Sequence, residues 1–169
     1  MTRILGVSGT LRKGGNTTIL LEEALKAVAG RAETDLVALA DAANGEQPPK
    51  AALADLARRF EAADAVLIAT PSHFGAPSAA LKALLDETWE AAKAHRLEGK
   101  LAAALVVEAE TGGELAAQAL AHWAHVHRMD FLGYVVGRGL KEREVLFDIK
   151  AVRGARGLAT RVADRLERR

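Results

Sequence analysis

The sequence contains no cysteine among its 169 residues. That absence excludes a disulfide scaffold, a thiolate metal site, an iron–sulfur cluster held by cysteine and a cysteine nucleophile. An excess of charge of one sign is also lacking, because 23 basic and 22 acidic side chains leave a net charge of +1 with histidine neutral. Proteins whose main partner is nucleic acid normally carry a large basic excess, so we expect no nucleic-acid partner.

Long hydrophobic runs are missing as well. The short apolar run that follows Arg3 is interrupted at Gly6, which is too early for the apolar region of a signal peptide. No stretch approaches the roughly 18 uncharged apolar residues that mark a membrane-spanning helix. We therefore expect a cytoplasmic protein with no membrane partner.

The residues that are present indicate a globular protein. Half of them (50%) are hydrophobic, which together with the small net charge excludes disorder. The length predicts a single domain over residues 1–169, large enough to bury a core without covalent staples. Alanine occurs 36 times and aromatic residues make up only 4%. Small side chains in such number favour tightly packed helices and close backbone approaches.

Short apolar runs alternate with longer segments of helical periodicity along the whole chain. The runs predict strands at residues 4–8, 34–39, 65–69, 101–107 and 131–136. The helical segments are residues 17–29, 51–63, 79–94, 114–128 and 149–168. Loops are predicted at residues 40–49, which contain Asn44-Gly45 and Pro48-Pro49, at residues 71–78, and at a charged connector, residues 137–144.

This alternation predicts an α/β fold, a parallel sheet with helices on both faces. At this length the natural candidate is a doubly wound three-layer sandwich of five strands in the order 2-1-3-4-5. Its ligand site lies at the carboxyl ends of the first and third strands, where the strand order changes direction. The loops after the first, third and fourth strands should therefore carry the function.

The loop after the first strand combines hydroxyls, glycines, cations and a helix start in residues 8–18. Backbone N–H groups at a helix start favour an anion, and glycine lets the backbone approach it closely. The side chains that could contact a phosphate are Ser8, Thr10, Arg12, Asn16, Thr17 and Thr18. The alternative is a polar turn in which Asn16 or Thr17 only caps the helix.

Two common phosphate motifs do not fit this loop. Gly9 and Gly14 have the spacing of a nucleotide P-loop, but Gly15 stands where the motif requires lysine, so we exclude hydrolysis of ATP or GTP. The dinucleotide fingerprint fails as well, because Gly6 is followed by Val7-Ser8-Gly9. What remains is a hydroxyl-rich loop suited to a single terminal phosphate.

The loop after the third strand is the most specific stretch of the sequence. Residues 70–86 resemble the corresponding loop of the flavodoxin-like NAD(P)H-dependent FMN reductases and NAD(P)H:quinone reductases, T/S-P-x-Y/R-F/N-G-x-x-[SP]-x-x-L-K-x-x-[IL]-D. The matching positions are Thr70, Pro71, Phe74, Gly75, Ser78, Leu81, Lys82, Leu85 and Asp86. The same family's first loop resembles this chain at Ser8, Arg12, Asn16 and Thr17, and its fourth loop resembles Gly112-Gly113.

The resemblance implies FMN as cofactor, with its phosphate in the first loop and its ring between the third and fourth loops. By that carry-over the ring is edged by Pro71, Ser72, His73, Phe74 and Gly75, and closed on its other side by Glu110, Thr111, Gly112 and Gly113. Flavin accepts hydride from nicotinamide directly, so no nucleophile or metal is required. We assign no catalytic residue, and His73 is the only titratable candidate beside the implied ring.

Several other features have structural interpretations. His122, His125 and His127 resemble a metal motif, but on a helix only His122 and His125 share a face, so we predict no metal site. Trp89 and Trp123 are interpreted as core or subunit-interface anchors, and Asp86 as structural. The arginines of residues 153–169 are accompanied by acidic residues, which indicates a solvated helix.

The leading hypothesis is an FMN-binding oxidoreductase that passes hydride from NAD(P)H, its co-substrate, to a quinone, free flavin or similar small acceptor. The resemblance also implies a homodimer or homotetramer. A flavodoxin-like electron carrier is a second possibility, although such carriers usually present a strongly acidic surface to their partners. A flavin-free binding module on the same fold is a third. The sequence does not distinguish NADH from NADPH.

Overall fold

A computed structural model describes residues 2–43 and 47–169. Its central sheet contains the parallel strands β1 (Arg3–Ser8), β2 (Glu33–Ala38), β3 (Ala65–His73), β5 (Leu101–Glu108) and β6 (Asp130–Arg138), in the order β2-β1-β3-β5-β6. A two-residue strand, β4 (Ala76–Pro77), pairs with the end of β3 in antiparallel fashion. The predicted flavodoxin-like order is therefore confirmed.

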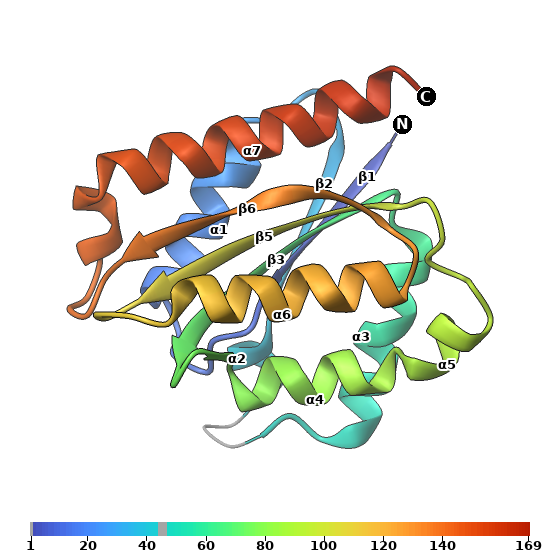
Figure 1. The fold of residues 1–169 in the computed structure, drawn as a ribbon, viewed down its shortest axis with the longest axis horizontal. Helices are drawn as coiled ribbons and strands as arrows, with labels where there is room; N and C mark the ends of the chain where they lie inside the picture. Colours follow the sequence, from blue (N-terminus) through green and yellow to red (C-terminus); the bar gives the residue numbers. More distant parts are fainter. Residues whose placement is uncertain (1, 44–46) are drawn as a thin grey trace.

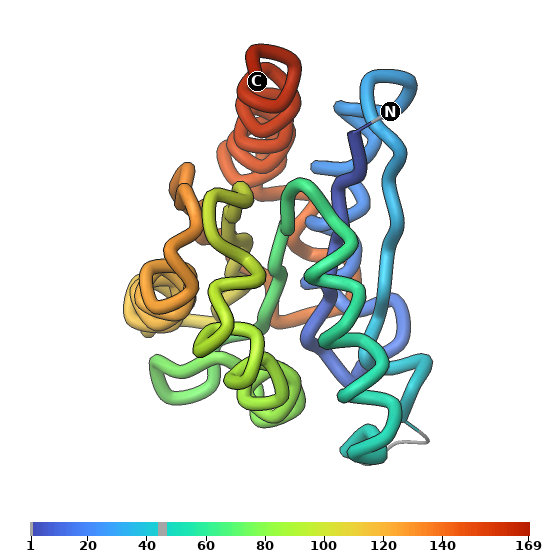
Figure 2. Tube along the Cα trace, turned by 90° about the vertical axis from the view of Figure 1, so that its right-hand side faces the viewer, coloured from blue at the N-terminus to red at the C-terminus, as the bar shows by residue number. Residues whose placement is uncertain are grey.

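Helices cover both faces of the sheet (Figures 1 and 2). One face carries α1 (Asn16–Lys26) and α7 (Ile149–Glu167). The other face carries α3 (Lys50–Ala62), α4 (Ala79–Glu87), α5 (Trp89–Lys93) and α6 (Gly113–Val126). Two short elements complete the chain, the one-turn helix α2 (Leu39–Ala42) and the 3₁₀ turn η1 (Glu144–Phe147).

The strands divide their side chains between the two layers because successive residues point to opposite faces. Along β3, Ala65, Leu67 and Ala69 pack under α1 and α7, whereas Val66 and Ile68 face the helices on the other side. All five are at most 2% exposed, which is why the strand is a continuous apolar run.

Small residues allow the helices to approach the sheet closely. A Cβ at Gly6 of β1 would lie 2.8 Å from Leu25 Cδ1 of α1, so that position has no room for a side chain. Ala102, Ala103 and Ala104 of β5 are at most 2% exposed and separate layers on both sides. The abundance of alanine is thus explained by thin interfaces between layers.

Two predicted loops and one predicted helix need correction. Residues 39–42 form the helical turn α2 where we expected a loop from residue 40, and Asn44-Gly45, predicted in that loop, lies outside the described residues. Residues 71–78 are a β-hairpin rather than a loop, because β3 continues to His73 and pairs with β4. The single helix predicted to residue 94 is divided at Thr88, whose hydroxyl donates to the carbonyl of Leu85 (2.6 Å).

The charged connector is shorter than predicted, because β6 runs on to Arg138 and η1 begins at Glu144. Within the described ranges, no helix is both long and apolar enough to cross a bilayer.

Burial on β3 leads to a stability prediction. Replacing Leu67, which is 0% exposed, by alanine should lower the free energy of unfolding by about 2–5 kcal/mol, since it leaves a cavity in the centre of the sheet. The matched control Leu115→Ala, on a side chain 60% exposed, should change it by less than about 0.5 kcal/mol. Urea unfolding measures both, and equal losses would contradict the described packing.

Candidate functional site

A cavity of about 430 Å³ opens at the carboxyl ends of β1 and β3, where the strand order changes direction. Sequence segments that are far apart form its walls: the loop between β1 and α1, the β3–β4 hairpin with the start of α4, the end of β5, and the connector after β6, with Gln47 added from the segment before α3. Its lining residues are Thr10, Leu11, Arg12, Gly15, Asn16, Thr17, Gln47, Pro71, Ser72, His73, Ser78, Ala79, Ala80, Val107, Ala109, Gly139 and Leu140.

The start of α1 presents backbone donors to this cavity. Gly15 is the N-cap, no side chain caps the helix, and its first turn contains no acidic residue. The alternative that Asn16 or Thr17 serves only as a cap is therefore wrong. Uncapped N–H groups at a helix start attract an anion, and Arg12 lines the same wall.

The predicted phosphate contacts fall into two groups. Thr10, Arg12 and Thr17 line the cavity, and the Thr10 hydroxyl accepts a hydrogen bond from the Arg12 backbone N–H (3.1 Å). Ser8 and Thr18 do not line it; their hydroxyls are buried and hydrogen-bonded to each other (2.8 Å). Their side chains therefore support the start of α1 from behind.

Asn16 lines the cavity, but its side chain is directed to the connector. Its Nδ2 donates to the carbonyl of Lys141 (2.8 Å), and its Oδ1 accepts from the N–H of Val145 (3.3 Å). The side chain is thus committed to residues that lie 125 and 129 positions further along the chain.

The β3–β4 hairpin forms the opposite wall. Pro71, Ser72 and His73 line the cavity. Phe74 and Gly75 form the two-residue turn, with positive φ values of 53° and 76° that suit a type I′ hairpin. Because the turn directs the Phe74 side chain away, it is fully exposed (109%) and does not line the cavity.

The predicted fourth loop supports the hairpin and is not part of the cavity lining. A Cβ at Gly112 would lie 2.9 Å from the backbone nitrogen of Gly75 and 3.2 Å from Ser72 Oγ, so the two loops touch through glycine. Glu110, Thr111, Gly112 and Gly113 are absent from the lining, and Val107 and Ala109 take their place. These four residues as flavin contacts stay a prediction.

One polar atom of the cavity wall has no partner. Ser72 Oγ is buried and makes no hydrogen bond within the described part of the chain. The hydroxyl lies against Gly112 of the fourth loop and is not open to the cavity. The uncapped start of α1, with Thr10 and Arg12 beside it, is the feature that fits a ligand with a phosphate such as FMN.

Sequence reasoning missed the connector and the start of α4. Ser78 Oγ donates to the carbonyl of Gly9 (2.5 Å) and accepts from Leu81 N–H (3.1 Å), joining the first loop to the third. Only the Ser78 match to the family motif signalled this role. Gly139 and Leu140 had no signal, because the connector reads as a charged surface loop.

Two carboxylates near the cavity, those of Glu108 and Glu144, are hydrogen-bonded to backbone N–H groups. Glu108 accepts from Gly113 N–H (2.8 Å) and lies 3.5 Å from the Arg138 guanidinium, so its charge is used at the start of α6. Glu144 accepts from the N–H groups of Lys141 and Leu140 (2.7 Å each), and these bonds hold the pKa of that carboxyl below its ordinary value.

A larger hollow of about 730 Å³ lies between α4, α5 and α6. Its lining comes mainly from these helices, including Trp89, Trp123 and His127, with Ala76 and Pro77 of β4 at one side. His122 and His125 stack at 6.2 Å on α6, whereas His127 is buried against the Thr88 hydroxyl (2.9 Å), and burial lowers its pKa. No group of three or more possible ligands gathers for a metal among residues 2–43 and 47–169.

Comparison with known proteins identifies the family of this chain. Residues 2–139 match the family described as NADPH-dependent FMN reductase. The chain belongs to this family. It is therefore a flavin-dependent oxidoreductase with FMN as cofactor.

Two curated relatives of this FMN reductase family member are iron–sulfur flavoproteins. That of Methanocaldococcus jannaschii is 30% identical over 146 residues, 78% of this chain and 76% of the relative. That of Methanosarcina thermophila is 31% identical over 150 residues, 78% of this chain and 77% of the relative. Among solved structures, the Trp repressor binding protein of Bacillus subtilis shares 26% identity at a TM-score of 0.78, over 92% of this chain and 98% of that one.

This family member differs from both curated relatives in its redox centres. Both relatives are named iron–sulfur flavoproteins, whereas this chain has no cysteine. Clusters of this kind are held by cysteine thiolates. A flavin, unlike such a cluster, is a redox centre that this chain can bind without cysteine thiolates.

The contact between the two glycine loops yields a second prediction. Gly112→Ala combines a positive φ of 94° with a methyl group 2.9 Å from Gly75 N, whereas Gly30→Ala has a φ of 82° and open space. Both should lose about 1–2 kcal/mol of unfolding free energy from strain, and Gly112→Ala about 1–3 kcal/mol more from the clash. Equal losses in urea unfolding would mean that the loops do not pack as described.

Proposed function

We propose that this protein transfers hydride from NADH or NADPH through FMN to a small acceptor such as a quinone or a free flavin. The observation that carries the proposal is the uncapped start of α1, which lies at the cavity on the β1/β3 edge beside Arg12 and Thr10. Membership of the NADPH-dependent FMN reductase family supports the same chemistry.

Each wall of the cavity has a role in this proposal. The N–H groups at the start of α1, with Thr10, Arg12 and Thr17, bind the phosphate. Residues 71–73 edge the flavin ring. When bound, FMN supplies a ring that accepts a hydride and passes electrons on, so the protein needs no nucleophile.

The substrate side is left open by small residues. Ala79, Ala80 and Ala109 line the cavity, and together with the hairpin they leave room for a planar donor or acceptor. The near-zero net charge supports an enzyme for small molecules over an electron carrier, because carriers of this fold steer their partners with a strongly charged surface. A homodimer or homotetramer and a cytoplasmic location stay predictions from the sequence.

Flavin binding and reduction test the proposal directly. After incubation with FMN and desalting, the protein should retain one flavin per chain, and NADH or NADPH should bleach its absorbance in the absence of oxygen. Retained flavin that neither nucleotide bleaches would support the carrier, and loss of all flavin on desalting with no measurable affinity would contradict both functions.

The phosphate end can be tested separately. Thr17→Asp should weaken FMN binding about tenfold or more, because a carboxylate at the helix start repels phosphate. Riboflavin, which has no phosphate, should bind as it does to the wild-type protein, and this also reports that the variant is folded. Thr17→Asn is the control, because asparagine has the shape of aspartate without its charge. Unchanged FMN affinity in Thr17→Asp, measured by fluorescence titration, would place the phosphate elsewhere.

A further inference from the structure

The connector between β6 and α7 is fastened to the start of α1. Besides the two hydrogen bonds of the Asn16 side chain, Gly139 N–H donates to the carbonyl of Glu108 (3.0 Å). The Lys141 carbonyl, which accepts from Asn16, also accepts from Glu144 N–H (3.2 Å). The loop therefore has a defined path, although it reads as a charged surface segment in the sequence.

The fit between Asn16 and the connector is close. Asn16 is 9% exposed, and Val145, which it holds, is fully buried. A Cβ at Gly139 would lie 2.6 Å from Asn16 Nδ2, so only glycine lets the connector pass this side chain. The Asn16 side chain therefore sets the distance between the start of α1 and the connector.

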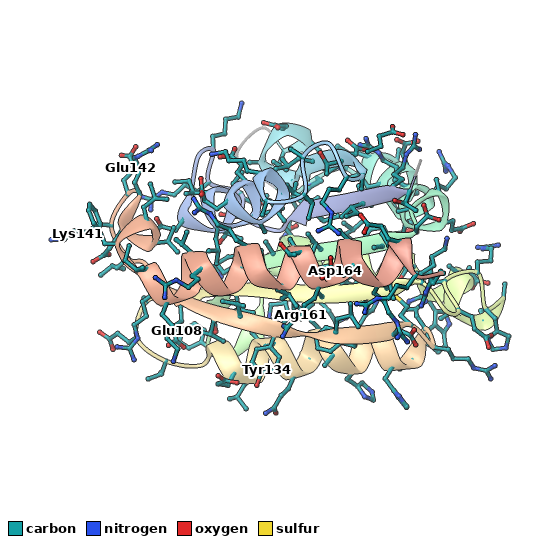
Figure 3. The ribbon with its side chains drawn as sticks, turned by 90° about the horizontal axis from the view of Figure 1, so that it is seen from above. Glu108, Tyr134, Lys141, Glu142, Arg161 and Asp164 are labelled. Carbon is teal, nitrogen blue, oxygen red and sulfur yellow. The ribbon has the colours of Figure 1, made fainter. Side chains whose placement is uncertain are left out.

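The connector presents an apolar side chain at the cavity. Leu140 lines the cavity yet is 66% exposed, while its own N–H and that of Lys141 are held by Glu144. Figure 3 shows Lys141 and Glu142 pointing outward at this end of the molecule, away from the sheet. Small-molecule pockets are lined mainly by apolar side chains, so Leu140 is placed to contact an apolar part of a ligand bound in this cavity.

We propose that Asn16 is a positioning residue that holds Leu140 against the bound flavin, and that it does not bind the phosphate through its side chain. The inference rests on the proposed function, because it assigns a further wall to the same FMN site. A leucine contacts the ring or the ribityl carbons, which FMN and riboflavin share. Removing Asn16 therefore weakens both flavins by the same factor.

The experiment measures the affinities of FMN and riboflavin by fluorescence titration in Asn16→Ala, Leu140→Ala and the double variant. Asn16→Ala should weaken both flavins roughly tenfold, since two hydrogen bonds that fix the connector are lost. The double variant should be no weaker than Asn16→Ala, because a displaced connector no longer presents Leu140. Glu142→Gln, at an outward-pointing side chain, is the control and should match the wild-type protein.

Gly139→Ala approaches the same contact from the connector and leaves Asn16 in place. It should weaken the affinities for FMN and riboflavin by the same factor. It replaces Asn16→Ala in the experiment if that variant does not fold. A loss in Asn16→Ala that is confined to FMN would overturn the inference in favour of a direct phosphate contact, as would unchanged affinities in all variants. A wild-type protein that binds neither flavin would overturn the proposed function itself, so the two failures are distinguishable.

Discussion

The site depends on the parallel pairing of β1 with β3. Because the two strands run side by side from Ile4 opposite Ala65 to Ser8 opposite Ala69, their loops must leave the sheet at the same point. The pairing extends into the first loop, where Gly9 N–H donates to the carbonyl of Ala69 (2.7 Å). A Cβ at Gly9 would lie 2.7 Å from that of Leu81 in α4, so the first loop packs against this helix with no space between them.

The polar groups that have no partner once the two loops have packed define the chemistry of the site. Most buried polar groups around the two loops bond to each other, as Ser8 does with Thr18 and Ser78 with Gly9. The start of α1 has no side-chain cap. Folded proteins tolerate such unsatisfied donors where a ligand completes them.

The sheet could be predicted from sequence because its signal is local. Continuous apolar runs such as residues 65–69 and helical spacing elsewhere determine the strand order, and the order determines the edge at which ligands bind. The third loop was located in the same way, but its hairpin was not, since nothing local showed that the exposed Phe74 would take a positive φ.

Long-range partners could not be predicted. The side chain of Asn16 was expected at the phosphate because its loop resembles a phosphate loop, yet its partner is Lys141, 125 residues away. Leu140 was missed for the same reason, as its role depends on where the connector lies and not on its neighbours in sequence. The missing cysteines were informative from the start, since they distinguish this chain from the iron–sulfur flavoproteins that it resembles.

The central claim is that FMN binds at the β1/β3 edge with its phosphate at the start of α1. Backbone amide chemical shifts, followed by ¹⁵N–¹H NMR as FMN is added, test it most directly. The account predicts the largest shifts at Asn16, Thr17 and Ser72, and none at Trp89 or Val126 in the larger hollow between α4, α5 and α6. Shifts confined to that hollow, with the start of α1 unchanged, would contradict it.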